Sequence, residues 1–187
     1  WNNRFRRQKL IEEKQYNVAL QKWLSLQIEQ PDNNNVNYKV GMCYLNSANE
    51  KAKSLPYLLK ASYSISKNYD PFSSAETESP NETYFYLAKA YHINSEIDSA
   101  ILSYTKFKEN VSKKHYLFKM VDHHLAQCEY AKKAMANPVN IKINNMGGAI
   151  NSTYSDFSPV VSIDESSIFF ISRRVRKDSS NYYVKDI

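Results

Sequence analysis

The chain has 187 residues, 42% of them hydrophobic and 24% charged, with a formal net charge of +6. This composition is typical of a globular protein with one or two domains. No run of residues is long and apolar enough to form a membrane-spanning helix.

The positive charge is distributed along the chain, which argues against nucleic acid as a partner. Lys and Arg outnumber Asp and Glu by 19 to 14 up to Asn137 and by 6 to 5 from Pro138 onward. Tight basic clusters occur only at residues 4–9 and 173–177. A nucleic-acid-binding protein usually concentrates its charge and places exposed aromatic side chains within it. A solvated basic face is the favoured interpretation.

The first clear helical pattern starts at Tyr16, and Pro31 is expected to close the helix. Ala19, Trp23 and Leu26 fall on one helical face, as a small, a large and an apolar residue. The same spacing recurs at two later places, although the third position of the last copy is large. These copies are Ser54, Leu58 and Ala61, and Ala100, Tyr104 and Phe107.

A second pattern occupies the partner helices. It places a small residue where two helices would cross closely, followed by an aromatic residue one turn later. Its copies are Val40-Gly41 with Tyr44, Leu87-Ala88 with Tyr91 (preceded by the bulky Tyr84), and a weaker Leu125-Ala126 in which Glu129 replaces the aromatic residue.

This alternation resembles the tetratricopeptide repeat, whose unit has roughly 34 residues. Ala19 and Ser54 are 35 positions apart. Gly41 and Ala88 are 47 apart, which is one unit plus an insertion, and the Pro- and Ser-rich segment 68–81 is the predicted loop. The resemblance covers residues 5–136 and implies an α-helical tetratricopeptide-repeat solenoid. A generic helical bundle is the alternative.

Arrays of this kind curve and offer a concave groove, lined by the first helix of each pair. The register places seven candidate protein-binding residues in this groove, and each of them also fits a packing or solvated role. They are Tyr38, Met42, Phe85, Lys89, His92, His123 and Gln127.

No catalytic, cofactor-binding or metal site is predicted. His123 and His124 are adjacent, so on a helix they point about 100° apart, and no carboxylate or cysteine completes a familiar ligand spacing. The four histidines are therefore interpreted as surface residues. Cys43 and Cys128 are expected to be buried thiols, two repeats apart and too distant for a disulfide. No phosphate-binding loop or nucleophile–base pair is present in the sequence, so no enzyme is expected.

After the last helix, expected to end at Asn137-Pro138, the hydrophobic period becomes two. Alternating apolar residues at 139–143 predict a half-buried strand. Gly147-Gly148 are expected to turn the chain as it enters a sheet domain. Further strands are predicted at 168–172 and 182–187, separated by a polar turn at 173–181.

Residues 154–174 resemble the opening repeat of a WD40-like propeller of the TolB-related type. The matching residues are Ser158-Pro159, Ser162, Asp164, Ile168, Phe170, Ser172 and Arg174. Pro159 is expected to rigidify the entry, and Asp164 to cap the turn with its side chain. The predicted organisation is a helical repeat domain at residues 1–137 and the truncated start of an all-β propeller at 138–187. A lone blade has unpaired edges, so either the rest of the propeller follows Ile187 or this segment pairs with a partner. A fragment of a longer protein is expected, because the chain starts inside an expected helix and ends inside an expected strand.

The order of these parts resembles the OmpA-family proteins of Bacteroidota. In that family the propeller is followed by a carboxypeptidase-regulatory-like domain and an OmpA-like peptidoglycan-binding domain, which lie outside this chain. Some members associate with type IX secretion and gliding-motility machinery and with PorP/SprF-type outer-membrane barrels. The resemblance implies a non-catalytic periplasmic scaffold at the outer membrane. Its partner would be a barrel or the barrel's complex, and a domain outside this chain would bind peptidoglycan.

Two other functions stay open. One is a cytoplasmic peptide- or chaperone-binding adaptor, which a signal peptide or lipoprotein cysteine before Trp1 would exclude. The other is an enzyme whose catalytic domain follows Ile187, which the downstream sequence would decide. A carbohydrate- or peptide-binding role for the propeller segment also stays open.

Overall fold

The computed structural model describes residues 2–73, 75–177 and 183–185 and divides into two units, Trp1–Pro138 and Val139–Ile187. Seven α-helices lie among the described residues. They are α1 (Asn2–Glu12), α2 (Tyr16–Glu29), α3 (Asn34–Leu45), α4 (Ser54–Ala61), α5 (Glu82–Ile93), α6 (Ile97–Asn110) and α7 (Phe118–Ala136), with a 3₁₀ turn η1 (Lys51–Lys53) before α4.

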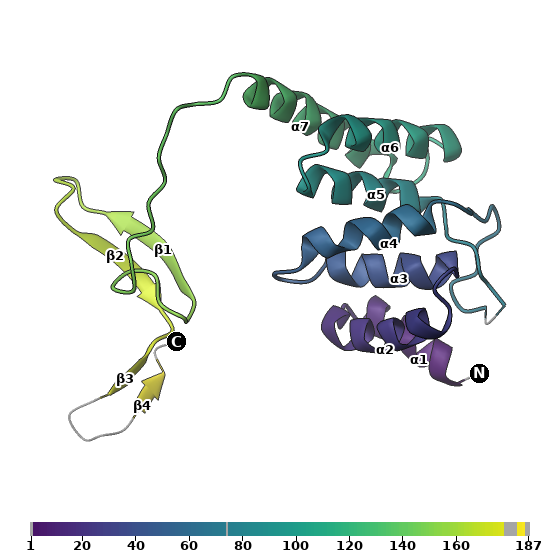
Figure 1. Ribbon diagram of the computed structural model, residues 1–187, viewed down its shortest axis with the longest axis horizontal. Helices are drawn as coiled ribbons and strands as arrows, with labels where there is room; N and C mark the ends of the chain where they lie inside the picture. The colour runs from purple at the N-terminus through teal and green to yellow at the C-terminus, as the bar shows by residue number, and fades with distance from the viewer. Residues whose placement is uncertain (1, 74, 178–182, 186–187) are drawn as a thin grey trace. The chain divides into compact units, whose positions relative to one another are not determined.

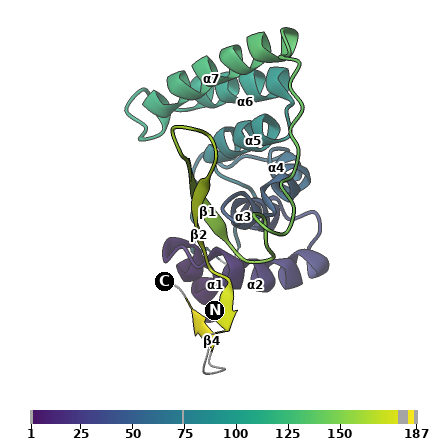
Figure 2. The same cartoon turned by 90° about the vertical axis from the view of Figure 1, so that its left-hand side faces the viewer.

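In the first unit the helices stack on one another in chain order (Figures 1 and 2). α3 packs on α2 and α4, α5 packs on α4 and α6, and α7 packs on α6. α5 also touches α3 and α7: the rings of Tyr38 and Tyr86 have centroids 6.2 Å apart, and those of Phe85 and His124 are 5.5 Å apart. These three helices therefore share one side of the stack.

The predicted small–large spacing accounts for the helix contacts. All nine residues of the three copies are buried: Ala19, Trp23, Leu26, Ser54, Leu58, Ala61, Ala100, Tyr104 and Phe107. The second pattern is also confirmed at Gly41, where a Cβ atom would lie 2.5 Å from Leu58 Cγ. A small residue is thus required where α3 meets α4.

The third copy of the second pattern keeps its predicted register but is buried only in part. Leu125 is half-buried and Cys128 is fully buried, and they correspond to the buried Val40 and Cys43 of α3. Ala126 is exposed. Gly41 is covered by Leu58 of the next helix, α4, whereas no described helix follows α7 to cover Ala126.

The insertion between α4 and α5 is a loop, as predicted, and it packs against the start of α3. The Tyr69 hydroxyl donates to Asn35 Oδ1 at 2.7 Å, and Asn35 Nδ2 donates to the Glu76 carbonyl at 3.2 Å. The Asn35 backbone N–H donates to the Thr77 carbonyl at 3.0 Å. Together with α2, α4 and α5, this loop leaves every residue from 35 to 45 in α3 buried.

The second unit contains two antiparallel strand pairs, β1 (Asp156–Val161) with β2 (Ile168–Ser172) and β3 (Val175–Lys177) with β4 (Tyr183–Lys185). In the first pair, Phe157 lies opposite Ile171 and Val160 opposite Phe169. The register shift between them forms a bulge at Ser158-Pro159, where Ser158 has a φ of 54°. Proline lacks an N–H for the ladder, so a bulge accommodates it within a strand.

The strand predictions are correct in part. The strand at 168–172 is confirmed as β2, and the one at 182–187 corresponds to β4, its outer residues 182 and 186–187 lying outside the described part. The strand predicted at 139–143 is wrong: these residues form no strand, and Val139, Ile141 and Ile143 are exposed. An alternating pattern forms a strand only where another strand supplies backbone partners. The polar turn predicted at 173–181 is also wrong in part, because it contains β3.

Two predicted turns are confirmed. Asp164 Oδ1 accepts hydrogen bonds from Ser162 Oγ at 2.6 Å and from the Ser166 backbone N–H at 3.3 Å. The Gly147 carbonyl accepts from the Asn151 backbone N–H at 2.8 Å, and Gly147 has a φ of 78°. A φ of this sign favours glycine, so Gly147 turns the chain before β1.

Candidate functional site

The seven predicted groove residues divide into two groups. Tyr38 and Met42 are buried among side chains of α3, α4 and α5, and Phe85 is buried against Tyr104 and Phe107 of α6. These three residues contribute to the core and line no open surface. Their burial follows from the packing of α3 on α4 and α5, and of α5 on α6 and α7, which encloses these side chains.

The other four residues gather on an open surface between α5 and α7. Two adjacent hollows, of about 490 and 240 Å³, share His92 and Gln127 in their walls. The larger hollow is also lined by His123 and the smaller by Lys89. We call these four residues, together with the apolar wall of Ala126 and Tyr130, the α5–α7 surface.

The ring-bearing residues Tyr104, His124 and Tyr130 also line these hollows but were not predicted for the groove. Tyr104 was interpreted only as a core residue of its helix. His124 lies three residues before Gln127, and its Nδ1 is 3.0 Å from Gln127 Oε1. That spacing on one helical face is the sequence signal that would have placed His124 beside Gln127.

The walls of the α5–α7 surface contain Lys89 and no acidic residue among the described ones. Burial lowers the pKa of Lys89, and the nearby Lys51 lowers it further. Burial likewise lowers the pKa of His124, against the opposite effect of its contact with Gln127, and Lys89, His123 and His92 add to the lowering. Both shifts therefore arise chiefly from desolvation, with a smaller contribution from neighbouring cationic groups.

The histidines are less exposed than predicted. Only His123 is exposed, whereas His92, His115 and His124 are half-buried. The His124 ring stacks on Tyr104 with centroids 5.3 Å apart, and His115 Nε2 lies 3.1 Å from Glu82 Oε1. The prediction missed these contacts because each joins residues that are distant in the sequence.

The cysteines are free and buried, as predicted. Cys128 Sγ lies 3.7 Å from His92 Nδ1, but burial raises the pKa of the Cys128 thiol, which opposes formation of a nucleophilic thiolate. Among the described residues no group of three or more His, Cys, Asp or Glu side chains is arranged to hold a metal ion. The same part of the chain has no helix of the length and apolarity that crossing a bilayer requires.

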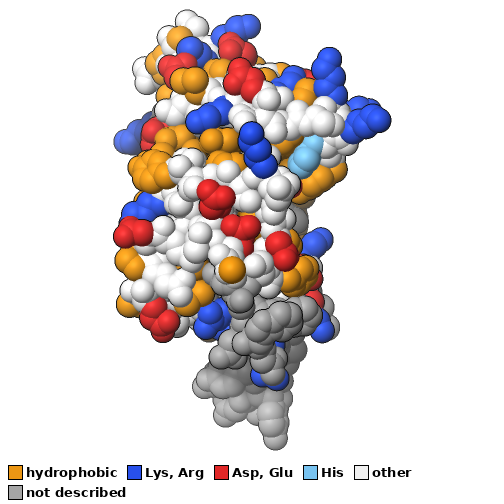
Figure 3. Space-filling view, turned by 90° about the vertical axis from the view of Figure 1, so that its right-hand side faces the viewer, with side chains coloured by type: hydrophobic (Ala, Val, Ile, Leu, Met, Phe, Trp, Pro, Cys, Tyr) orange, Lys and Arg blue, Asp and Glu red, His pale blue; other side chains and the backbone are white. Residues whose placement is uncertain are grey.

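Charges of both signs are interspersed on the face of the molecule shown in Figure 3. Basic and acidic side chains alternate there with apolar ones, and no continuous basic field covers this face. Binding to a phosphate backbone relies on such a field.

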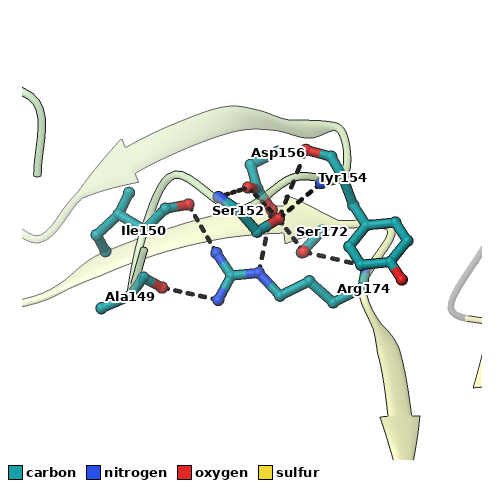
Figure 4. A network of polar contacts seen from close by, with 7 residues as sticks. All are labelled: Ala149, Ile150, Ser152, Tyr154, Asp156, Ser172 and Arg174. Carbon is teal, nitrogen blue, oxygen red and sulfur yellow. Dashed lines mark hydrogen bonds and ion pairs between the residues drawn. The ribbon is translucent and has the colours of Figure 1, made fainter. Parts of the chain in front are cut away.

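In the second unit, residues of the propeller-like motif form a closed polar network around Asp156 (Figure 4). Its carboxylate accepts from Ser172 Oγ at 2.5 Å and from the backbone N–H and hydroxyl of Ser152, both at 2.7 Å. Arg174 Nε lies 3.4 Å from Asp156 Oδ1, and the guanidinium donates to the carbonyls of Ala149 and Ile150 at 2.8 and 2.7 Å.

This network holds the segment before β1 against the end of β2. Chiefly the Ser172 hydroxyl, then the Ser152 backbone N–H, hold the pKa of Asp156 well below its usual range. The Asp156 side chain is only 10% exposed. With its carboxylate already bound by these groups, the network is structural and offers no ligand site.

Comparison with protein-family models, with curated proteins and with solved structures finds no match for this chain.

Proposed function

We propose that the helical unit is a tetratricopeptide-type array and acts as a non-catalytic scaffold that binds a protein partner. One observation carries this proposal: Lys89, His92, His123 and Gln127, which the repeat register places in a groove, gather around two open hollows between α5 and α7. The regular stacking of helices around buried small and large residues supports the repeat interpretation.

We further propose that the second unit is the start of a TolB-type propeller and that the chain belongs to an OmpA-family protein of Bacteroidota. The positions that carry the resemblance support this proposal, because Asp164 caps its turn and Ser172 and Arg174 bind Asp156. In the full-length protein, the scaffold would lie in the periplasm. It would tether an outer-membrane complex, such as that of type IX secretion or gliding machinery, to peptidoglycan.

Site-specific photo-cross-linking in the producing cells tests this function. A photoreactive residue is placed at Gln127 on the α5–α7 surface, and in a control chain at Leu102, which is 71% exposed on α6. We expect cross-links from position 127 to an outer-membrane barrel protein or its complex, and none from position 102. Cross-links to cytoplasmic proteins alone, or equal products from both positions, would contradict the proposal.

A further inference from the structure

The α5–α7 surface offers hydrogen-bond donors and positive charge but no acidic side chain. The described residues that line its two hollows include a lysine, three histidines and a glutamine, and none is Asp or Glu. The remaining wall is formed by apolar and tyrosine side chains, namely Ile93, Tyr104, Ala126, Tyr130 and Ala131.

Among the described residues Lys89 lacks an acidic partner, unlike Lys108 and Lys132. Lys108 pairs with Asp122 at 2.6 Å, and Lys132 pairs with Asp98 at 2.5 Å. Lys89 forms no ion pair with any described residue, and it is half-buried. A half-buried ammonium group without a counter-ion is costly, and it favours a ligand that brings a negative charge.

The size and character of the hollows fit a short peptide. Adjacent hollows of about 490 and 240 Å³ open to solvent between two helices, and their shared residues His92 and Gln127 join them into one surface. Apolar walls with a few convergent polar groups are typical of binding sites. Nucleic acid would instead require a row of cations along its backbone, whereas this surface has one lysine.

We infer that the α5–α7 surface binds an acidic peptide segment of the partner protein, with a side-chain carboxylate of that segment accepting a hydrogen bond from Lys89 Nζ. Gln127 and His123 would bind polar groups of the same segment, while its backbone and apolar atoms pack on Ala126 and Tyr130. This inference rests on the proposed scaffold function and specifies the chemistry of the partner.

Fluorescence anisotropy with defined peptides tests the inference on the full chain. The probe is a fluorescein-labelled octapeptide of alternating Asp and Glu with an amidated C-terminus, and the matched probe has Asn and Gln in their place. We expect the acidic peptide to bind at least about fivefold more tightly than the neutral one, and Lys89→Gln to raise its Kd by about fivefold or more.

Lys132→Gln is the matched control, because it removes the same charge from α7 at a lysine already paired with Asp98. We expect it to change the Kd by less than twofold. Equal binding of the two peptides, or equal effects of Lys89→Gln and Lys132→Gln, would overturn the inference. Displacement of the peptide by an equimolar dT12 oligonucleotide would also overturn it in favour of nucleic acid.

The two proposals fail in different ways. A chain that cross-links through position 127 to a barrel protein, yet binds the acidic and neutral peptides alike, would keep the scaffold function and lose the acidic-segment inference. A chain that binds the acidic peptide through Lys89 but cross-links only to cytoplasmic proteins would keep the acidic-segment inference and lose the periplasmic scaffold function.

Discussion

Gly41 shows how a single hydrogen atom in place of a side chain fixes the spacing of two helices. A Cβ atom there would lie 2.5 Å from Leu58 Cγ and 3.3 Å from the Leu58 backbone nitrogen. We expect Gly41→Ala to lower the free energy of unfolding by about 1–3 kcal/mol, because α3 and α4 must separate. Urea unfolding followed by circular dichroism at 222 nm measures it. Gly148→Ala, with no atom within 4 Å of the added Cβ, is the control and should unfold like the native chain.

The hydroxyl of Tyr104 is a polar group placed in the hydrophobic core. The residue is fully buried, and its hydroxyl has no hydrogen-bond partner among the described residues. Tyr104→Phe keeps the ring that stacks on His124 and removes only the hydroxyl. We expect the free energy of unfolding to stay the same or to rise by about 1 kcal/mol, since an unsatisfied buried group is costly. A loss of stability in the same urea titration would show that the hydroxyl is bound in solution.

His124 gives the helical unit a pH-dependent stability. Burial lowers its pKa from the ordinary value of 6.5, so the unfolded chain binds a proton at a higher pH than the folded chain. The free energy of unfolding should therefore fall as pH decreases below about 6.5. We expect His124→Phe, which keeps a stacked ring, to lose less stability than the native chain between pH 7.5 and 5.5. Equal loss of stability by His124→Phe and the native chain over this pH range would contradict the assignment to His124.

Among the elements, the α4–α5 loop does more than connect two helices. It closes over the start of α3 through Asn35, whose side chain bonds both the Tyr69 hydroxyl and the Glu76 carbonyl. We expect Asn35→Ala to cost about 1–3 kcal/mol and to increase amide hydrogen exchange and chymotryptic cleavage across residues 64–79. Tyr69→Phe should have a smaller effect of the same kind.

Asn110→Ala is the control for the loop, because the Asn110 side chain bonds only the Lys106 carbonyl of its own helix. Unchanged exchange in Asn35→Ala would show that the loop is held by other contacts.

The elements also show where sequence patterns are sufficient. The helices could be predicted from spacings such as that of Ala19, Trp23 and Leu26. One apolar stripe of side chains determines both where a helix forms and which of its faces packs on a neighbour. The strand expected at 139–143 does not form, because an alternating pattern does not by itself provide a neighbouring strand for hydrogen bonding. β1 was missed since Ser158-Pro159 interrupts its pattern at the bulge.

Some residues of the candidate site could likewise be placed from the sequence, and others could not. Repeat register brought Lys89, His92, His123 and Gln127 to one surface, since each position follows from its own helix. The burial of Tyr38 could not be predicted in this way, because it depends on Tyr69 and Tyr86 from other elements, whose rings lie 6.3 and 6.2 Å away. Contacts of this kind have no periodic signature.

At the scale of the whole molecule, the two units are joined by an exposed segment. Residues 139–146 belong to no helix or strand, and the Lys142 side chain is exposed. We expect limited trypsin digestion to cut first after Lys142 and to release a helical fragment that resists further cleavage, because proteases prefer accessible, irregular backbone. Lys142→Gln should slow this first cut. Early cleavage within the helices instead would show that the helical unit depends on the rest of the chain.

The contacts that the α4–α5 loop makes with α3 affect whether the helix pairs can fold and be exchanged independently. In an ideal repeat array, each unit touches only its neighbours, so folding can begin anywhere and units can be exchanged or deleted. Here the start of α3 is covered by Tyr69 and Glu76, which follow Asn35 by 34 and 41 positions. A loop of that length must close before those contacts form. We therefore expect the segment from α3 to α5 to fold as one module. Recombination that preserves each helix pair but replaces the loop would leave α3 incomplete.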